Sequence, residues 1–363
     1  MKHDRKLIVL TLLALLLVSV VPLTAQDDED AEVEPIETGI DVVDEIQGFP
    51  AYNLPTDQIE VLEDLGDTVL VRHRFGETEV PKNPQRVFAD AATLPLAMSL
   101  NLPIVGGYYW EGAAEEAIPG WEELVAEAQI EPVTTYAYNF ELLLELEPDL
   151  ILAFSHIIYG GDNPETVYEN LSAIAPTIVV FNDPTELWPQ AMFELSQLFE
   201  LSDEAATSLE NAGETIAEAC EPLQELIGDE SVVFIQPIGG DVWVIGAGWM
   251  DGENFLPYSL TSHFYYFCGL NPPENLFDLV GTGSIQISQE LIPEIQADHL
   301  FVDTYDTEVD HDELLSSPLW QAVHAVQNGQ VYLIDNVFSG SYDMTLYAIE
   351  EVTSAVVSAS ESE

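Results

Sequence analysis

Positive charge is almost missing from this sequence. Seven lysines and arginines stand against 66 aspartates and glutamates, which gives a formal net charge of −59 over 363 residues. From Val87 to Glu363, histidine is the only residue type that can carry a positive charge. This argues against nucleic acid as a partner, because phosphate contacts need clustered lysine and arginine. Anionic membranes would repel the chain, and its acidic surface favours solubility and attracts cationic ligands or basic partners.

Catalytic motifs are also missing. The sequence has no nucleophile elbow and no Walker loop, and Gly239-Gly240 and Gly246-Ala247-Gly248 lack the spacing of a dinucleotide-binding loop. Acidic residues are so numerous that a pair of them carries no argument for catalysis. We therefore predict a binding protein rather than an enzyme, with no resident cofactor.

Cysteine is scarce, with only Cys220 and Cys268 present. No CxxC or Cys/His spacing predicts a zinc site. In an exported protein an even pair permits a disulfide, and two buried free thiols are the alternative, because spacing alone does not show that the sulfurs meet. No cysteine follows the N-terminal apolar run, which excludes a lipoprotein anchor at that point.

The first 25 residues have the pattern of a secretory signal. A basic start, MKHDRK, precedes an apolar run from Leu7 to Val21 and a cleavage motif, Leu23-Thr24-Ala25. An uncleaved anchor is the alternative, because the run is only slightly shorter than the roughly 20 residues of a membrane-spanning helix. Either outcome predicts an extracytoplasmic protein. Residues 26–67 begin with an acidic stretch poor in large apolar residues, and we predict a flexible segment there.

Two stretches of the chain repeat one pattern, NFELLLELEPDLILAF at 139–154 and SQELIPEIQADHLFVD at 288–303. Each begins with a plausible N-cap, Asn139 or Ser288, places a glutamate two residues later and continues as a short amphipathic helix. Each then breaks, at Pro148-Asp149 or Ala297-Asp298, into an apolar strand. The repetition predicts two similar α/β halves with the functional surface in the cleft between them. Chance recurrence of a helix–strand pattern is the alternative.

Strands and helices alternate through both halves, which favours a parallel sheet. We predict an N-terminal α/β lobe over residues 68–183 and a C-terminal α/β lobe over residues 229–363. Between them, residues 184–228 read as one long helix, broken at most near Leu201-Ser202-Asp203, that acts as a stiff strut. In the C-terminal lobe we also expect a helix across Phe255 to Phe267.

Several motifs, in this order, resemble the periplasmic binding proteins that deliver ferric siderophores, haem or cobalamin to ABC importers. They are FGETEVPKNPQRVFA at 75–89, LPIVGG at 102–107, NFELLLELEPDLILA at 139–153, LSAIAPTIVVF at 171–181 and SPLWQAVHAVQNGQVYLID at 317–335. The resemblance spans about residues 68–357. It implies two Rossmann-like lobes bridged by one long rigid helix, a ligand held between the lobes, and a monomer that docks on an ABC permease.

Docking in this family uses one exposed glutamate on each lobe against basic patches of the permease. The matching positions are Glu141 and Glu290, the third residue of each repeated stretch. A carboxylate in the first turn of a helix is also favoured by the helix dipole. Support of the helix start is therefore the alternative role.

Aromatic residues and one histidine fall where loops follow the carboxyl ends of predicted strands, the usual place for a ligand in α/β sheets. Such side chains suit a flat or apolar chelate, and core packing is the alternative for each of them. The predicted ligand contacts are Tyr108, Tyr109, Trp110, Tyr136, Tyr138, His156, Tyr159, Trp243, Trp249, Tyr305, Phe338 and Tyr342.

The sequence departs from many relatives in lacking basic residues for this cleft. Arg86 stands at the start of a strand, where a structural role is expected, and Arg72 and Arg74 lie in the leading hairpin. Because a trianionic ligand in a site without cations faces a large desolvation cost, we predict a neutral or cationic chelate carrying Fe³⁺, such as a ferric hydroxamate, or a corrinoid.

Other ligands and roles stay open. One alternative is a cobalamin or haem binder of the same fold. Another is direct metal capture by His156, His263, Tyr159 and Tyr305, although no compact cluster marks such a site. His311 and His324 are expected on helices or at the surface. A surface sensor or scavenger that does not transport is a further alternative.

Overall fold

The structure is a computed structural model, and not every residue is described in it. The described ranges are 59–110, 117–133, 137–154, 163–180, 188–245, 248–251, 254–257, 263–276, 286–335 and 340–360. The predicted signal at residues 1–25 lies outside them. Among the described residues, no helix combines the length and apolar composition that a membrane span requires.

A small antiparallel sheet of three strands opens the described chain. Its strands are β1 (Glu60–Asp64), β2 (Thr68–His73) and β3 (Gly76–Pro81), in that order. The prediction of a flexible segment up to residue 67 is therefore wrong at its end. β1 is mostly acidic and exposed, so its composition does not predict a strand. The strand forms by pairing with β2. Just before it, the buried Ile59 donates its amide to Glu194 Oε2 at 3.0 Å.

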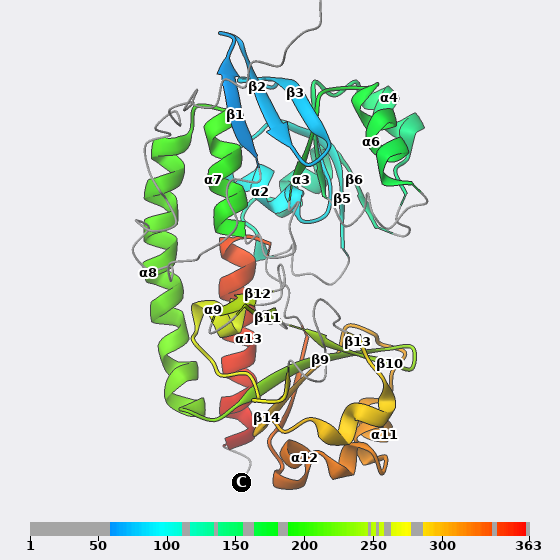
Figure 1. The fold of residues 1–363 in the computed structure, drawn as a ribbon, viewed down its shortest axis with the longest axis vertical. Coiled ribbons are helices and arrows are strands. Elements are labelled where there is room, and N and C mark those ends of the chain that lie inside the picture. Colours follow the sequence, from blue (N-terminus) through cyan, green and yellow to red (C-terminus); the bar gives the residue numbers. More distant parts are fainter. Residues whose placement is uncertain are drawn as a thin grey trace, which may run out of the picture. The chain divides into compact units, whose positions relative to one another are not determined.

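The first large sheet has five strands, and each neighbouring pair is parallel, as the alternation of strands and helices predicts (Figure 1). Its order is β6 (Gln129–Pro132), β5 (Ile104–Tyr109), β4 (Val87–Ala89), β7 (Leu150–Phe154) and β8 (Thr177–Val180). The described helices between these strands are α2 (Thr93–Ser99), α3 (Trp121–Glu127), α4 (Phe140–Leu146) and α6 (Pro164–Ser172).

Two glycines let β5 lie close to its neighbours. A Cβ atom at Gly107 would stand 2.1 Å from the carbonyl oxygen of Ala89 on β4. One at Gly106 would stand 2.4 Å from Leu146 Cδ1 of α4. At Gly107 only glycine fits, because the neighbour is backbone; at Gly106 a larger residue would have to displace the Leu146 side chain.

Two helices follow the first large sheet, α7 (Trp188–Leu198) and α8 (Ser202–Ile227). The stretch predicted as one long helix consists of these two helices, and the break that the sequence allows near Leu201 falls at residues 199–201, where Glu200 has a positive φ of 59°. The longer of the two is α8, with 26 residues. α8 packs against the C-terminal helix α13 (Tyr342–Ser360), and Trp188 Nε1 of α7 donates to Thr345 Oγ1 of α13 at 3.0 Å.

The two cysteines form a disulfide that joins α8 to the end of α9 (His263–Phe267). The Cα atoms of Cys220 and Cys268 are 5.1 Å apart, and both side chains are fully buried. One turn further along α8, Gln224 Nε2 donates to the carbonyl oxygen of Cys268 at 2.7 Å. Of the two alternatives for the cysteines, the structure has the disulfide.

The second large sheet differs from the first in strand direction. Its order is β13 (Gln286–Ile287), β10 (Asp241–Ile245), β9 (Val232–Ile238), β14 (His299–Asp303) and β15 (Val331–Ile334). β9, β14 and β15 are parallel, whereas β10 is antiparallel to both β9 and β13. Gly239 and Gly240, with φ values of 63° and 159°, join β9 to β10. A two-residue turn joins only antiparallel strands, so the two halves are less alike than the repeat predicts.

The predicted helix across Phe255 to Phe267 is wrong in its first part. β11 (Gly248–Asp251) and β12 (Asn254–Pro257) form an antiparallel pair, and the helix α9 is limited to residues 263–267. The Asp251-Gly252 dipeptide is a sequence signal for a hairpin, and Pro257 disfavours helical backbone at the residue before it.

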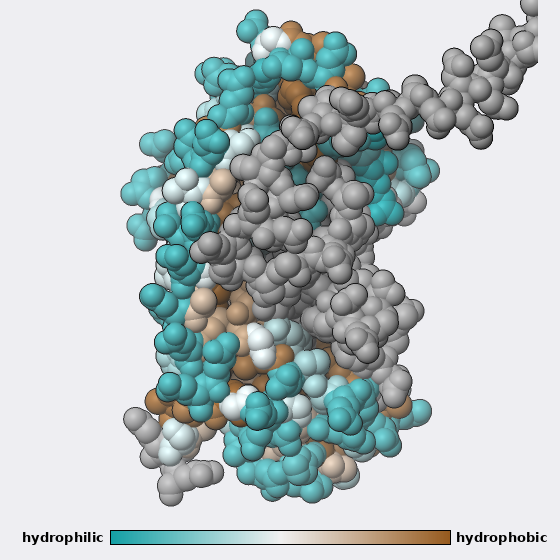
Figure 2. Space-filling view, turned by 60° about the vertical axis from the view of Figure 1, so that its left-hand side comes forward, coloured by the Kyte–Doolittle hydropathy of each residue, from teal (hydrophilic) through white to brown (hydrophobic). Residues whose placement is uncertain are grey.

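The remaining elements of the second half are short, apart from α13. They are η3 (Gln289–Glu294), α11 (His311–Ser316), η4 (Trp320–Ala322) and α12 (His324–Asn328). His311 and His324 each begin one of these helices, as expected. On the face drawn in Figure 2, hydrophilic residues cover much of the described surface, with smaller hydrophobic areas between them.

Candidate functional site

A buried carboxylate lies at the carboxyl edge of the first large sheet. Asp90 directly follows β4, and its side chain is fully buried. Its Oδ1 accepts the Phe154 amide at the end of β7 at 2.5 Å, and its Oδ2 accepts the hydroxyl of Tyr138. Burial raises the pKa of Asp90 to about 7. The two hydrogen bonds act in the opposite direction and lower it, but burial is the larger effect. The edge where a ligand is expected thus carries a carboxylate that titrates near neutral pH.

Two of the predicted contact residues surround this carboxylate, and both are largely buried. The Tyr138 and Tyr108 rings lie 6.0 Å apart, and each residue is 6% exposed. The Tyr108 hydroxyl accepts the Asn139 amide at 2.8 Å. Burial raises the pKa of both phenols, that of Tyr138 well above its ordinary value. Both hydroxyls are therefore neutral and bonded within the protein, so these tyrosines support the edge from inside.

Tyr109 and Trp110 continue from the end of β5 and are half-buried. The Trp110 ring packs edge-on against Phe154 with centroids 5.4 Å apart, and the Tyr109 ring packs edge-on against Trp121 at 5.3 Å. Trp110 is therefore held by the residue whose amide binds Asp90.

The second large sheet has a comparable carboxylate at the end of β14. Asp303 is fully buried, and it accepts the Tyr305 amide at 2.7 Å and Gln236 Nε2 of β9 at 3.2 Å. Burial raises the pKa of Asp303 to about 7. Of the predicted contacts nearby, Tyr305 is 43% exposed and Trp243 lies half-buried on β10.

The other predicted contacts are scattered or fall outside the described residues. Tyr342 begins α13 and is half-buried. Trp249 belongs to β11, but its side chain is not described. The residues that lie outside the described ranges are Tyr136, His156, Tyr159 and Phe338.

Asp90 and Asp303 are absent from the sequence-based prediction, although a signal for them exists. Each ends a run of three buried apolar residues, Val87-Phe88-Ala89 and Leu300-Phe301-Val302. An aspartate placed directly after a buried strand stands at the edge where α/β sheets bind ligands. The pattern of aromatic residues after the strands does not indicate this polar position in either half.

The predicted docking residues lie on the first turns of two different helix types. Glu141 and Glu290 are both exposed, on α4 and on the 3₁₀ helix η3. The Asn139 side chain caps α4 by accepting the Leu142 amide at 3.1 Å, whereas the Ser288 side chain makes no cap bond. Each repeated stretch begins with a short helix, as predicted, but the second is a 3₁₀ helix, and Pro293 inside it has no amide for an α-helical bond.

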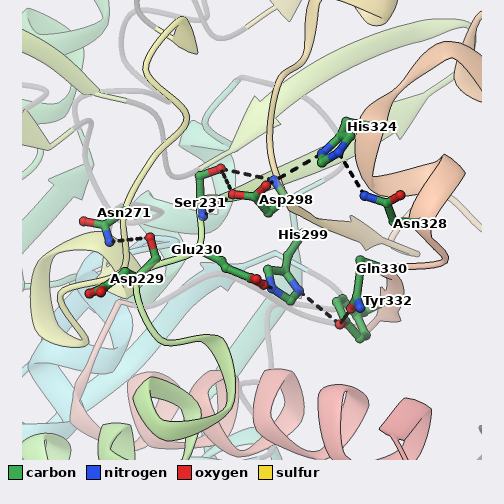
Figure 3. Close-up of polar contacts among 10 residues, drawn as sticks. All are labelled: Asp229, Glu230, Ser231, Asn271, Asp298, His299, His324, Asn328, Gln330 and Tyr332. Carbon is green, nitrogen blue, oxygen red and sulfur yellow. Dashed lines mark hydrogen bonds and ion pairs between the residues drawn. The ribbon is translucent and has the colours of Figure 1, made fainter.

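The repeated stretches are nevertheless equivalent at one aspartate each. Asp149, before β7, accepts the amides of Gln85 and Arg86 at 2.7 and 2.9 Å, just before β4. Asp298, before β14, accepts the Ser231 amide at 2.9 Å and its hydroxyl at 2.7 Å, just before β9 (Figure 3). Both carboxylates thus fasten a strand to the start of its parallel neighbour.

The described basic residues lie away from the carboxyl edges of both large sheets. Arg86 Nε donates to the carbonyl oxygens of Leu146 and Glu147 at 3.1 and 3.0 Å, which satisfies the end of α4. The expected structural role of Arg86 is thereby confirmed. In the leading sheet Arg72 pairs with Glu60 and Glu77, and Lys82 pairs with Asp64 and Glu200.

Metal-ligating side chains do not converge in the part of the chain that the structure describes, where no group of three or more histidines, cysteines or carboxylates could hold a metal ion. The buried His299 has protein partners on both ring nitrogens (Figure 3). Its Nε2 lies 2.6 Å from Glu230 Oε2, and its Nδ1 lies 3.0 Å from the Tyr332 hydroxyl. We assign His299 to the support of β14.

Two α/β sheets, a long helix between them and polar groups at the carboxyl edges define a ligand-binding protein of the two-lobed type. Residues 122–337 match the family described as periplasmic binding protein, and the chain belongs to that family. This agrees with the predicted binding role, because the family consists of binding proteins and not of enzymes.

Comparison with individual proteins gives more distant similarities. The iron(3+)-hydroxamate-binding protein FhuD of Bacillus subtilis (strain 168) is 24% identical over 283 residues, which cover 75% of this chain and 80% of that protein. The structure of the FhuD protein from S. pseudintermedius matches with a TM-score of 0.61 at 19% identity, over 80% of this chain and 99% of the other. Staphylococcus aureus SirA complexed with staphyloferrin B also has a TM-score of 0.61, at 23% identity over 79% and 98%. These two structures show the shared fold.

Proposed function

We propose that this protein is the extracytoplasmic substrate-binding protein of an ABC importer and that it captures a neutral or cationic ferric hydroxamate. Family membership supports the general role. The similarity to a hydroxamate-binding protein supports the ligand class. The iron belongs to the ligand, and the protein holds the chelate between its two lobes.

The observation that carries the ligand preference is the charge at the carboxyl edges. Asp90 and Asp303 stand there, whereas Arg86 is bound to the end of α4. The sequence contains no lysine or arginine after Arg86, so no loop that follows a strand of either large sheet can supply one. An anionic catecholate or carboxylate complex would lose its hydration without gaining a cationic partner. A hydroxamate complex carries no such charge.

The test is a binding titration of the mature protein against chelates that differ mainly in charge. Ferrioxamine B carries one positive charge on a terminal amine, and its N-acetylated form is the same chelate without that charge. We expect both to bind, with tighter binding of the cation and an advantage that shrinks as salt is added. Ferric enterobactin, a trianion, is expected to bind more weakly than either.

The outcomes separate the alternatives. Tighter binding of ferric enterobactin than of ferrioxamine B contradicts the ligand preference. Binding of haem, cobalamin or free Fe³⁺ alone assigns the fold to one of the other ligands. A ligand that binds only the folded state raises the melting temperature of the protein. If none of these compounds raises the melting temperature of the folded protein, the proposed function is contradicted.

A further inference from the structure

Asp90 is an unusual residue for the interior of a protein. Its carboxylate is fully buried, and its two oxygens accept hydrogen bonds from a phenol and a backbone amide. Burial of a carboxylate is unfavourable unless the charge is compensated. Such a group is retained at a cost to stability, and perturbed groups of this kind gather at functional sites.

The carboxylate joins segments that are distant in the sequence. Through Phe154 it holds the end of β7, and through Tyr138 it holds the segment that leads into α4. The next residue, Asn139, donates its amide to the Tyr108 hydroxyl at the end of β5 and caps α4 with its side chain. One network therefore fixes the ends of β4, β5 and β7 and the start of α4.

The backbone around Asp90 is fixed as well. Thr93 Oγ1 of α2 accepts the Asp90 amide at 2.9 Å and donates to the Leu152 carbonyl oxygen of β7 at 2.8 Å. Because Asp90 itself cannot shift easily, its carboxylate acts as a rigid anchor for the two segments that it holds. The half-buried Trp110, a predicted ligand contact, packs on Phe154 and so depends on the same anchor.

We propose that Asp90 is a positioning residue for ligand capture, whose ionised carboxylate fixes the end of β7 and the segment before α4 at the ligand-binding edge. This inference rests on the proposed function, and it adds a named residue and a dependence on protonation. The ionised form holds both segments most strongly, because each oxygen then accepts a charge-assisted hydrogen bond. A protonated carboxyl group can still accept the Phe154 amide, but it must donate to the Tyr138 hydroxyl instead of accepting from it, and both bonds become weaker neutral ones.

The two phenols that face Asp90 keep their protons near neutral pH. Tyr138, before α4, and Tyr108, on β5, are phenols whose pKa values are raised by burial. α2 contributes the hydroxyl of Thr93, and β7 contributes an amide. Glu131, on β6, acts on Tyr108, whose pKa it raises. Burial raises the pKa of Asp90 itself to about 7.

The experiment measures the affinity for ferrioxamine B between pH 5.5 and 8.5 in four forms of the full mature chain. The forms are the wild type, Asp90→Asn, Tyr138→Phe and Asp149→Asn. The asparagine at position 90 has the shape of the protonated acid. Asp149→Asn is the matched control, because Asp149 also accepts two backbone amides but at the opposite edge of the same sheet. Melting temperature and circular dichroism confirm that each variant is folded.

In the wild type we expect the affinity to fall as pH falls through about 7. Asp90→Asn should bind about tenfold more weakly at pH 8, the effect of losing one good hydrogen bond to a charged group, and its affinity should not depend on pH. Tyr138→Phe should lose affinity and keep a pH step, and Asp149→Asn should follow the wild type. An Asp90→Asn variant with the wild-type profile, or a wild type without a step between pH 6 and 8, overturns the proposal.

A second readout separates this proposal from the proposed function. Amide hydrogen exchange without ligand, at pH 8, reports the held segments directly. Asp90→Asn should exchange faster than the wild type at residues 138–142 and at Phe154, and Asp149→Asn should not. If the wild type binds no ferrioxamine B and the exchange difference is present, the ligand assignment fails and the positioning role stands. If exchange in Asp90→Asn is unchanged, the positioning role fails whatever the protein binds.

Discussion

At the scale of single residues, buried carboxylates make the stability of this protein depend on pH. The sequence of the C-terminal lobe contains no lysine or arginine that could pair with Asp303. Its carboxylate accepts hydrogen bonds from the amide of Tyr305 and the side chain of Gln236 instead. Burial raises its pKa from 3.8 to about 7. A group whose pKa is higher in the folded than in the unfolded state favours folding at low pH. Its contribution is fully present below about pH 4 and is lost as pH rises through about 7.

We therefore expect the free energy of unfolding to fall between pH 4 and pH 7, and the Asp303→Asn variant to lose part of this slope. The contribution of one such carboxylate is on the order of 4 kcal/mol at most. An asparagine can still accept the Tyr305 amide, and its own amide can donate to Gln236 after that side chain turns over. Urea unfolding of both forms at pH 5 and pH 8 measures the difference.

The comparison between the two forms is needed because the whole acidic chain repels itself more strongly as pH rises. That repulsion acts equally on the wild type and on the variant. Equal pH slopes in the two forms would show that Asp303 is not the group that titrates.

Residue types at the site were only partly predictable. The sequence placed Tyr108 and Tyr138 at the carboxyl edge of the first sheet, which is correct. It could not show that both are largely buried, because an aromatic residue after a strand packs inward or faces a ligand with the same local pattern. The aspartates that end β4 and β14 carried the clearer local signal.

At the scale of elements, one face of α8 is linked to the segment that follows α9. Cys220 and Gln224 are one turn apart on this helix, and both bind Cys268, by the disulfide and by a hydrogen bond to its carbonyl oxygen. The disulfide closes a loop with a sequence separation of 48 residues. Cross-links of this kind stabilise a fold mainly by restricting the unfolded chain.

Removal of the disulfide is expected to lower the free energy of unfolding by about 4 kcal/mol, the value that chain entropy gives for a loop of this length. The variant is Cys220→Ala combined with Cys268→Ala, which leaves no unpaired thiol. The measurement is the urea midpoint of the oxidised wild type and of the variant. Ligand affinity serves as the control, because the disulfide does not touch Asp90 or its partners. Equal midpoints would contradict a stabilising role.

Elements were more predictable where local pattern and long-range pairing agree. The parallel first sheet and the helical character of the stretch that forms α7 and α8 follow from the sequence. β1 carries no local strand signal and forms through its pairing with β2. The β11–β12 pair does have a local signal, the Asp251-Gly252 dipeptide, which the predicted helix across Phe255 to Phe267 leaves unused. The pattern of residues 288–303 predicts a helix, but it does not distinguish an α-helix from the 3₁₀ geometry that η3 adopts around Pro293.

For the whole molecule, charge determines which partners are possible. The exposed Glu141 and Glu290 lie on elements of the two different lobes. We propose that they meet basic patches of the permease. Because the chain is acidic throughout, an acidic surface alone would give attraction without a defined orientation, and two fixed carboxylates would supply the orientation.

Reversal of both charges, Glu141→Arg with Glu290→Arg, is expected to abolish delivery of the ligand while binding is preserved. The measurement is uptake by the cognate permease and ATPase in liposomes. Glu145→Arg with Glu294→Arg is the matched control, because it changes the net charge equally at exposed positions on the same two elements. Equal uptake by the two double variants would contradict a specific docking role.

The attachment of Arg86 has a consequence for how the protein endures outside the cell. Trypsin-like proteases cut after lysine or arginine, and the bond between Arg86 and Val87 is the last such bond in the sequence. The Arg86 side chain is bound to the end of α4, and Val87 is fully buried in β4. Because proteases need an exposed, mobile segment, the last bond that they could cut is closed to them while the sheet is intact. Everything beyond it, including the loops that follow the strands of both large sheets, contains no lysine or arginine and offers such enzymes no cleavage site at all.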